Sequence, residues 1–283
     1  MMKKVSLFLI VLMCLWSQAQ NYKVIYQVNW KPSVEKDSIM TDLAVLAINN
    51  RHSYFTGYDN FRNDSLKSKI VTEFFNGNGQ GNLRFPDPAK LSRFNKTIIK
   101  NIASDSTIQE EKYHVSTFQI VSTCKLKWKM EKETKTILGF VCKKASLDFG
   151  GRKWTAWYAE SIPISDGPYK FHGLPGLILS INDEKKEYSF EIKGITKEIN
   201  DVGYRNFGMP NPVKLSPSKW ETFYARYKDQ PSVIFENLNT EHTTYVINGK
   251  DIDRNEKIAY NLKEKKYLLE NNNMIELISD CKK

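Results

Sequence analysis

The sequence predicts an α+β fold, a single domain dominated by antiparallel β-sheet with two or three helices packed on it. Three observations support this prediction. Several short segments alternate apolar and polar side chains, which is the period of a half-buried strand. The turns between them are short, and short turns join antiparallel neighbours because parallel strands need long crossovers. Two other segments repeat apolar side chains every three or four residues, which is the period of a helix.

The first expected strand covers residues 22–30, where aromatic and β-branched side chains occupy every second position. Residues 43–48 and 53–58 flank the connection 49–52 and are predicted to form a hairpin. The segment from residue 113 to 200 is expected to be almost continuously β. Its predicted strands are residues 115–126, 136–143, 153–161, 177–182 and 187–196.

A short amphipathic helix is predicted near residues 66–74, because Leu66, Ile70 and Phe74 recur every four residues. The polar residues 63–65 can cap its start, and Gly77 follows its end.

A second helix is predicted from Pro217, with Ser216 as its cap and Pro231 beyond its end. It carries an aromatic stripe, which is more typical of a core-facing surface than of a ligand platform. The stripe consists of Trp220, Phe223, Tyr224 and Tyr227. Residues 257–278 mix short apolar runs with charge and yield no assignment.

The first nineteen residues have the layout of a secretory signal peptide. Lys3 and Lys4 precede an apolar run over residues 5–16, and small side chains then favour cleavage between Ala19 and Gln20. The run is shorter than the roughly 20 residues that a membrane-spanning helix needs. We therefore expect residues 20–283 to form one exported domain with no transmembrane span, in the periplasm or at the periphery of the outer membrane.

The chain is basic, with a formal net charge of +10. Its lysines occur as scattered pairs and not as a stripe, so the charge indicates either a solvated surface or attraction to anionic headgroups or glycans. Export separates the protein from most nucleic acid, which is not an expected partner.

Cys124 and Cys142 are the candidate disulfide pair, because export implies an oxidising compartment. A hairpin centred on Glu133 would place them opposite each other, and Cys281 would remain unpaired. The cysteine and histidine spacings match no metal signature, and no cofactor is expected.

Residues 151–181 are the most distinctive segment. Trp154, Trp157 and Tyr158 belong to one expected strand, on which the two tryptophans point to opposite faces. A tight turn follows, with Pro175 suited to the second position of a type II turn and Gly176 to the third. The turn and the buried strand after it comprise Gly173, Leu174, Pro175, Gly176, Leu177 and Ile178.

This segment resembles the signature of the GLPGLI family, exported and mostly uncharacterised proteins of Bacteroidota. Around the complete match at residues 173–178, further matches lie at 151–152, 157–158, 162–163, 167–168 and 171. Residues 273–277 resemble a closing motif of the family, with Met274 in place of proline. The resemblance implies a cell-envelope protein and brings no established catalytic residues.

The signature segment allows two interpretations. In the architectural one, its glycines and prolines form turns and its apolar residues bury a corner of the sheet. In the functional one, residues 171–175, from Phe171 and His172 to Pro175, form a semi-rigid lip on an apolar cleft walled by Trp154, Trp157 and Tyr158. A weaker analogy with half-barrel envelope proteins of the lipoprotein-carrier type would make the sheet a curved half-barrel.

Because no catalytic signature is present, the leading hypothesis is a non-catalytic binding or carrier protein for an apolar or amphipathic ligand. One alternative is an envelope hydrolase that uses His172 with Asp166 as an acid–base pair. Another is an assembly partner of an outer-membrane transporter.

Overall fold

The computed structural model describes most of the chain from residue 21 onwards. The described residues are 21–49, 52–77, 79–80, 82, 84–85, 90–113, 116–198, 212–236, 246–247, 250–251 and 253–279. The expected signal peptide and the Ala19–Gln20 junction lie outside them.

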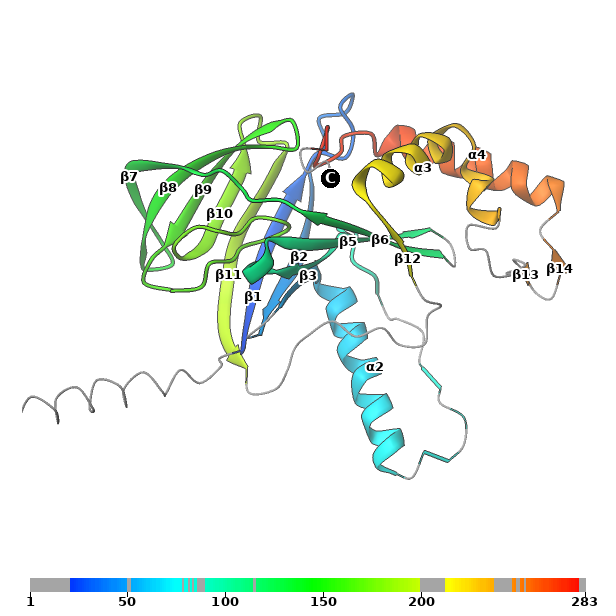
Figure 1. Ribbon diagram of the computed structural model, residues 1–283, viewed down its shortest axis with the longest axis horizontal. Helices are drawn as coiled ribbons and strands as arrows, with labels where there is room; N and C mark the ends of the chain where they lie inside the picture. The colour runs from blue at the N-terminus through cyan, green and yellow to red at the C-terminus, as the bar shows by residue number, and fades with distance from the viewer. Residues whose placement is uncertain are drawn as a thin grey trace, which may run out of the picture.

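Twelve strands form one open, curled sheet, which confirms the predicted α+β class (Figure 1). The sheet order is β12-β6-β5-β4-β3-β2-β1-β11-β10-β9-β8-β7, and all neighbours are antiparallel except β12 and β6. The bounds are β1 Asn21–Trp30, β2 Met40–Ile48, β3 Ser53–Gly57, β4 Thr97–Asn101, β5 Ser106–Tyr113, β6 Ser116–Thr123, β7 Lys129–Ile137, β8 Phe140–Phe149, β9 Arg152–Ala159, β10 Leu177–Asp183, β11 Tyr188–Glu198 and β12 Val213–Leu215. A separate ribbon pairs β13 Val246–Ile247 with β14 Lys250–Asp251.

The middle of the sheet follows the sequence pattern closely. Along β1 the even-numbered residues from Val24 to Trp30 are buried, as the period of two predicts. β2 and β3 form the expected hairpin, with Ile48 opposite Ser53. β1 then joins the N-terminal hairpin to β11, which lies far along the chain.

The hairpin of β7 and β8 turns at a different place from the one predicted. Ile137 faces Phe140, so the turn residues are Leu138 and Gly139, with φ of 48° and 81°. Positive φ at both central residues is the requirement of a two-residue type I′ turn. The segment 136–143, predicted as a single strand, therefore contains the turn.

The helix α2 (Tyr58–Asn76) ends where the sequence predicts but begins several residues earlier. The hydroxyl Oγ of Ser92 caps it from a distant segment, accepting hydrogen bonds from the backbone N–H groups of Asp59 (2.9 Å) and Asn60 (3.3 Å). Gly57 precedes the helix, and a Cβ there would lie 2.3 Å from Cβ of Ser92. A cap so far away in sequence could not be recognised from local motifs.

The helices α3 (Pro217–Asp229) and α4 (Arg254–Glu270) lie beside each other at the β12 end of the sheet, whereas α2 projects away from it (Figure 1). Ser216 caps α3 as predicted, accepting a 3.4 Å hydrogen bond from the Lys219 N–H. α4 begins with a capping box formed by Asp253 and Glu256. Short 3₁₀ turns cover Ile102–Ser104 and Pro231–Phe235.

Two of the three hydrophobic clusters among the described residues bear on the candidate site. The larger lies on one face of the sheet around β1, β9, β10 and β11 and includes most of the signature segment. The smaller joins β6 to α3 and the 3₁₀ turn that follows it, and contains Phe118, Phe223 and Tyr227. No helix within the described ranges is both long and apolar enough to cross a membrane.

Candidate ligand-binding groove

The signature residues form core and not a cleft wall. Trp154 is 1% exposed, its indole N–H donates to the Phe149 carbonyl at 2.9 Å, and its ring lies 4.7 Å from that of Phe171. Leu174, Leu177 and Ile178 are equally buried. These contacts support the architectural interpretation of the segment.

The two tryptophans of β9 do point to opposite faces, as predicted. Trp157 is half-buried, and the Lys135 ammonium lies 4.5 Å from its ring centroid. Tyr158 lies on the buried face with Trp154, and its hydroxyl approaches Sδ of Met130 at 3.5 Å. One wall of a cleft therefore cannot contain both Trp154 and Trp157.

The turn at Pro175 and Gly176 differs in detail from the expected type II turn. The Gly176 N–H donates to the Leu174 carbonyl at 2.8 Å, whereas the Leu177 N–H donates to Ile162 instead of closing the turn. Gly176 has φ of 153°, and a Cβ there would lie 2.2 Å from the Ala159 carbonyl oxygen. Close backbone approach is thus the reason for this glycine. Gly173 and Pro175 are exposed at the turn.

His172 does not pair with Asp166. Its ring is 3% exposed, with Nδ1 2.8 Å from the Lys170 carbonyl and Nε2 3.4 Å from a carboxylate oxygen of Asp105. Since Nδ1 faces a carbonyl, Nδ1 carries the proton that makes this hydrogen bond. A side chain so enclosed positions the loop and has no open approach for a substrate.

Asp166 instead forms a fully buried ion pair with Lys100 of β4. The Lys100 ammonium lies 2.5 Å from the Asp166 carboxylate and donates to the Gly167 carbonyl at 2.6 Å. Burial lowers the pKa of Lys100, and the Asp166 carboxylate opposes that effect. The pair ties the signature loop to the strand beneath it.

Arg152, at the start of the signature, binds the C-terminal segment that we call the strap (residues 271–279). Its guanidinium makes five hydrogen bonds, and all five N–H donors of an arginine are thereby satisfied. The partners are Asp183 (2.9 Å), Glu187 (2.7 Å), the Asn273 side chain (2.6 Å) and the carbonyls of Met274 (2.8 Å) and Ile275 (3.1 Å). The two segments that carry the GLPGLI resemblance thus meet at one buried arginine.

Glu276 fixes the next part of the strap. It forms an ion pair with Lys170 at 2.6 Å and accepts a hydrogen bond from the Tyr169 hydroxyl. Burial, followed by the nearby Glu276 carboxylate, raises the pKa of Tyr169 well above its usual value. The strap approaches Gly150 so closely that a Cβ there would lie 2.9 Å from Cγ of Glu276.

The predicted bridge between Cys124 and Cys142 is not formed. Cys142 is a free, buried thiol, and Cys124 is disulfide-bonded to a partner outside the described residues. The reason is the hairpin register, which places Lys135 opposite Cys142. Burial raises the pKa of the Cys142 thiol.

Two adjoining cavities lie between the sheet, the helices α3 and α4, and the strap. The first has a volume of about 520 Å³ and the second about 550 Å³. They share Lys96, Glu111, Tyr113, Tyr224, Met274 and Ile275, so we treat them as one elongated structure, the groove. No residue of the signature set 154, 157, 158 and 171–178 lines either cavity.

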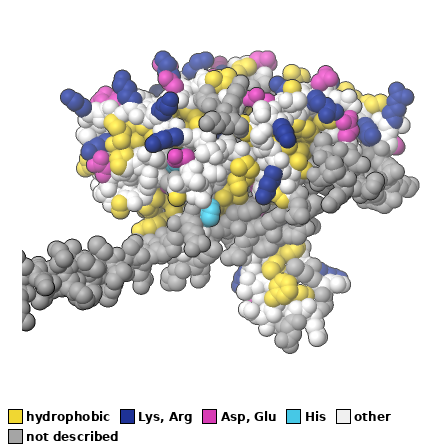
Figure 2. Space-filling view, in the orientation of Figure 1, with side chains coloured by type: hydrophobic (Ala, Val, Ile, Leu, Met, Phe, Trp, Pro, Cys, Tyr) yellow, Lys and Arg dark blue, Asp and Glu magenta, His cyan; other side chains and the backbone are white. Residues whose placement is uncertain are grey.

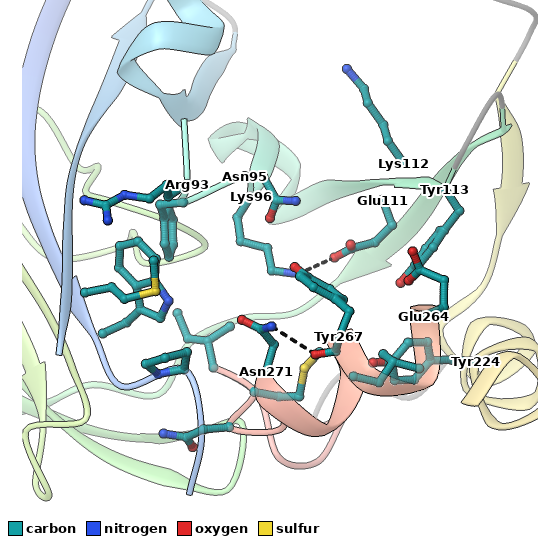
Figure 3. Close-up of a pocket in the computed structure, with 18 of the residues that line it drawn as sticks. Arg93, Asn95, Lys96, Glu111, Lys112, Tyr113, Tyr224, Glu264, Tyr267 and Asn271 are labelled. Atoms are coloured by element: carbon teal, nitrogen blue, oxygen red, sulfur yellow. Dashed lines mark hydrogen bonds and ion pairs between the residues drawn. The ribbon is translucent and has the colours of Figure 1, made fainter. Parts of the chain in front are cut away.

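The first cavity is rich in tyrosine (Figure 3). Tyr227 donates its hydroxyl to the Glu264 carboxylate at 3.0 Å, and burial raises its pKa strongly. Burial also raises the pKa of Tyr188 to about 12. The hydroxyls of Tyr188 and Tyr227 therefore stay neutral well above neutral pH. The six tyrosines of this cavity are Tyr113, Tyr188, Tyr224, Tyr227, Tyr260 and Tyr267.

An ion pair crosses the middle of the groove, where the Lys96 ammonium lies 2.8 Å from the Glu111 carboxylate (Figure 3). Burial lowers the pKa of Lys96 and the Glu111 carboxylate raises it, and the net effect is a raised pKa. Lys96 stays charged and paired at physiological pH, which makes it a poor base or nucleophile.

The groove was not recognised from the sequence because its residues come from many separated segments between residues 30 and 279. The segment 93–96, the strand β5 and the helix α4 all supply residues to it, and none of them carried an assigned periodicity. The aromatic stripe on α3 was the one available signal, and it contributes both to the core and to the groove. Phe223 and Tyr227 are buried, while Trp220 and Tyr224 remain half-buried in the groove.

Lys and Arg side chains lie scattered among acidic ones over the face in Figure 2, without a continuous basic stripe. Across the described part of the chain, no group of three or more His, Cys, Asp or Glu side chains could hold a metal ion.

Comparison with known proteins gives limited matches. No curated protein matches the chain. Two solved structures, described as "Structure of PNGF-II in P21 space group" and "Structure of PNGF-II in C2 space group", match with TM-scores of 0.48 and identities of 15% and 16%. Each match covers 74% of this chain and 34% of the other, and this likeness supports no functional statement. A family model described as "Protein of unknown function (Porph_ging)" matches residues 151–180, the segment that joins the core to the strap.

Proposed function

We propose that this protein is an exported, non-catalytic cell-envelope protein of the GLPGLI type that binds or carries an amphipathic ligand in the groove. The leader-like first nineteen residues support export, to the periplasm or the outer-membrane periphery. The groove supports binding, because concave sites lined by aromatic rings with a few placed polar groups are the usual form of ligand sites.

The single observation that carries the proposal is the composition of the groove. Its walls combine seven tyrosines with paired charges such as Lys96–Glu111, so apolar and polar surfaces lie together within one hollow. A purely apolar chain would cover these charges without satisfying them, which is costly. An amphipathic ligand can pack on the rings and bond to the polar groups.

Native mass spectrometry of the mature protein, purified gently from its own envelope, tests this proposal. We expect a bound mass that is lost on denaturation and is reduced in a Tyr224→Ala variant, because Tyr224 lines both cavities. A bare mass for the wild-type protein under the gentlest conditions would contradict it.

A second candidate function, assembly with an outer-membrane protein, is favoured by a different surface. Ile258, Leu262 and Leu269 lie on one side of α4 and are 47%, 68% and 69% exposed. An apolar stripe of this kind is typical of helices that pack on a partner. Co-purification that is lost in a Leu262→Glu, Leu269→Glu variant, while groove binding persists, would support this role.

A further inference from the structure

Nearly parallel aromatic rings run along one wall of the groove. The rings of Trp220 and Tyr224 are 5.6 Å apart at an interplanar angle of 20°, and those of Tyr224 and Tyr227 are 6.3 Å apart at 18°. Trp220 lines the second cavity, Tyr227 the first and Tyr224 both. The rings therefore succeed one another along the long direction of the groove, one helical turn of α3 after another.

Several charges of the groove already have partners. Lys96 pairs with Glu111 at 2.8 Å, and Lys170 pairs with Glu276 at 2.6 Å. Glu264 accepts the Tyr227 hydroxyl at 3.0 Å. A charged ligand would compete with these short, charge-assisted contacts, whereas a neutral polar ligand can add hydrogen bonds without breaking them.

Several other polar groups of the lining are both donors and acceptors. They are amides and hydroxyls, which suit ligand hydroxyl groups because a hydroxyl also donates and accepts. The groups concerned are those of Asn95, Gln109, Ser122, Asn271 and Asn272. Together with the rings, they match a molecule that has flat apolar faces and a polar rim and that repeats along its length.

We propose that the groove binds a neutral oligosaccharide, with successive sugar faces on Trp220 and Tyr224 and hydroxyl groups bonded to the paired charges and amides. This inference rests on the proposed function and names the ligand class of the same site. Pyranose rings have apolar faces and equatorial hydroxyls, and aromatic rings bind such amphipathic surfaces. The two cavities in series give an extended chain of sugars room that a single sugar would not fill.

The test is titration of the purified mature protein with neutral oligosaccharides of glucose, mannose and N-acetylglucosamine, followed by tryptophan fluorescence and calorimetry. At least one series should bind, and longer chains should bind more tightly than the monosaccharide. Tyr224→Ala should weaken that binding about tenfold or more, while Tyr224→Phe, which keeps the ring, should retain most of it. Phe75→Ala removes an aromatic ring that is 67% exposed on α2 and should have no effect. Thermal unfolding of each variant shows that it is folded.

Failure of this inference can be told from failure of the proposed function. If no oligosaccharide binds, or if Tyr224→Ala binds as well as the wild type, the oligosaccharide inference is overturned. A lipid or peptide mass on the native protein would then leave the proposed function in place. A bare native protein that also binds no oligosaccharide would overturn both.

Discussion

At the scale of single residues, a substitution of His172 distinguishes a structural role of this side chain from a catalytic one. His172→Ala removes the hydrogen bond from Nδ1 to the Lys170 carbonyl and leaves a space in the core. We expect the free energy of unfolding to fall by about 1–3 kcal/mol, as measured by urea unfolding, with ligand binding intact. His172→Asn, whose amide can replace the Nδ1 donor, should recover part of the loss. A variant of normal stability that loses binding or an activity would instead support the hydrolase alternative.

Several individual residues could be predicted from the sequence, and others could not. The opposite orientations of Trp154 and Trp157 follow from the period of a strand, and Ser216 was recognisable as a cap because its partner is three residues away. The partner of Asp166 is Lys100, 66 positions away along the chain, and no local pattern connects them. Close spacing in sequence instead suggested His172 as its partner.

At the scale of elements, the strap depends on Arg152. Arg152→Ala would leave the Asp183 carboxylate buried without its cation, which typically costs about 3–5 kcal/mol. We expect faster hydrogen exchange over residues 271–279 and weaker ligand binding, because Met274 and Ile275 line both cavities. Arg152→Lys keeps the charge but not the five donors, so its stability and ligand binding should lie between those of the wild type and Arg152→Ala.

The matched control is Arg62→Ala on α2, where the arginine side chain is 68% exposed. Its effect on unfolding should stay within about 0.5 kcal/mol. An undisturbed strap in Arg152→Ala would contradict the role assigned to this arginine.

The cysteines give a second prediction for the elements. Cys142 is free and Cys124 is bonded, and Cys14 belongs to the expected leader, so peptide mapping of the mature protein is expected to give a Cys124–Cys281 disulfide. Alkylation should label Cys142 only after unfolding, because the thiol is buried. Recovery of a Cys124–Cys142 peptide would contradict the observed register of β7 and β8.

The elements themselves differ in how far the sequence determines them. A strong period-two pattern located β1, and apolar segments between turn residues located β2, β9 and β10. The turn between β7 and β8 was missed because Leu138 adopts a positive φ that is rare for a side chain of its type. The helix α4 was missed because apolar residues occupy more than one of its sides, so no single apolar stripe marks it: Ile258, Leu262 and Leu269 are exposed, whereas Tyr260 and Leu268 pack against the cluster of Phe223 and Tyr227.

For the whole molecule, the buried tyrosines predict a loss of stability at high pH. Burial raises the pKa of Tyr188 from 10.0 to about 12, and burial also raises that of Tyr26 and Tyr169. These tyrosines make their full contribution to the free energy of unfolding below pH 10, where the unfolded chain also keeps their protons. The contribution is lost as the pH rises through their pKa values in the folded state. For Tyr188 alone the loss is about 2.7 kcal/mol. Lys100, with its lowered pKa, acts in the opposite direction but only below its usual value of 10.5.

Urea unfolding from pH 9 to 12, with tyrosinate absorbance of the native protein, measures this loss. Tyr188→Phe is the matched variant. It should be less stable than the wild type at neutral pH, since the Tyr188 hydroxyl donates to the Asn273 carbonyl at 2.6 Å. It should, however, lose less stability than the wild type as the pH rises. Native tyrosines that all titrate near pH 10 would show that these hydroxyls are not buried.

One measurement tests most directly whether the groove, and not the signature segment, is the functional surface. Hydrogen exchange of the envelope-purified protein should be compared before and after its bound molecule is removed. We predict protection by the ligand over residues 93–96, 109–113, 220–228 and 264–275, with no change at residues 154–158 and 171–178. Protection confined to residues 154–158 and 171–178, or none anywhere, would contradict the account.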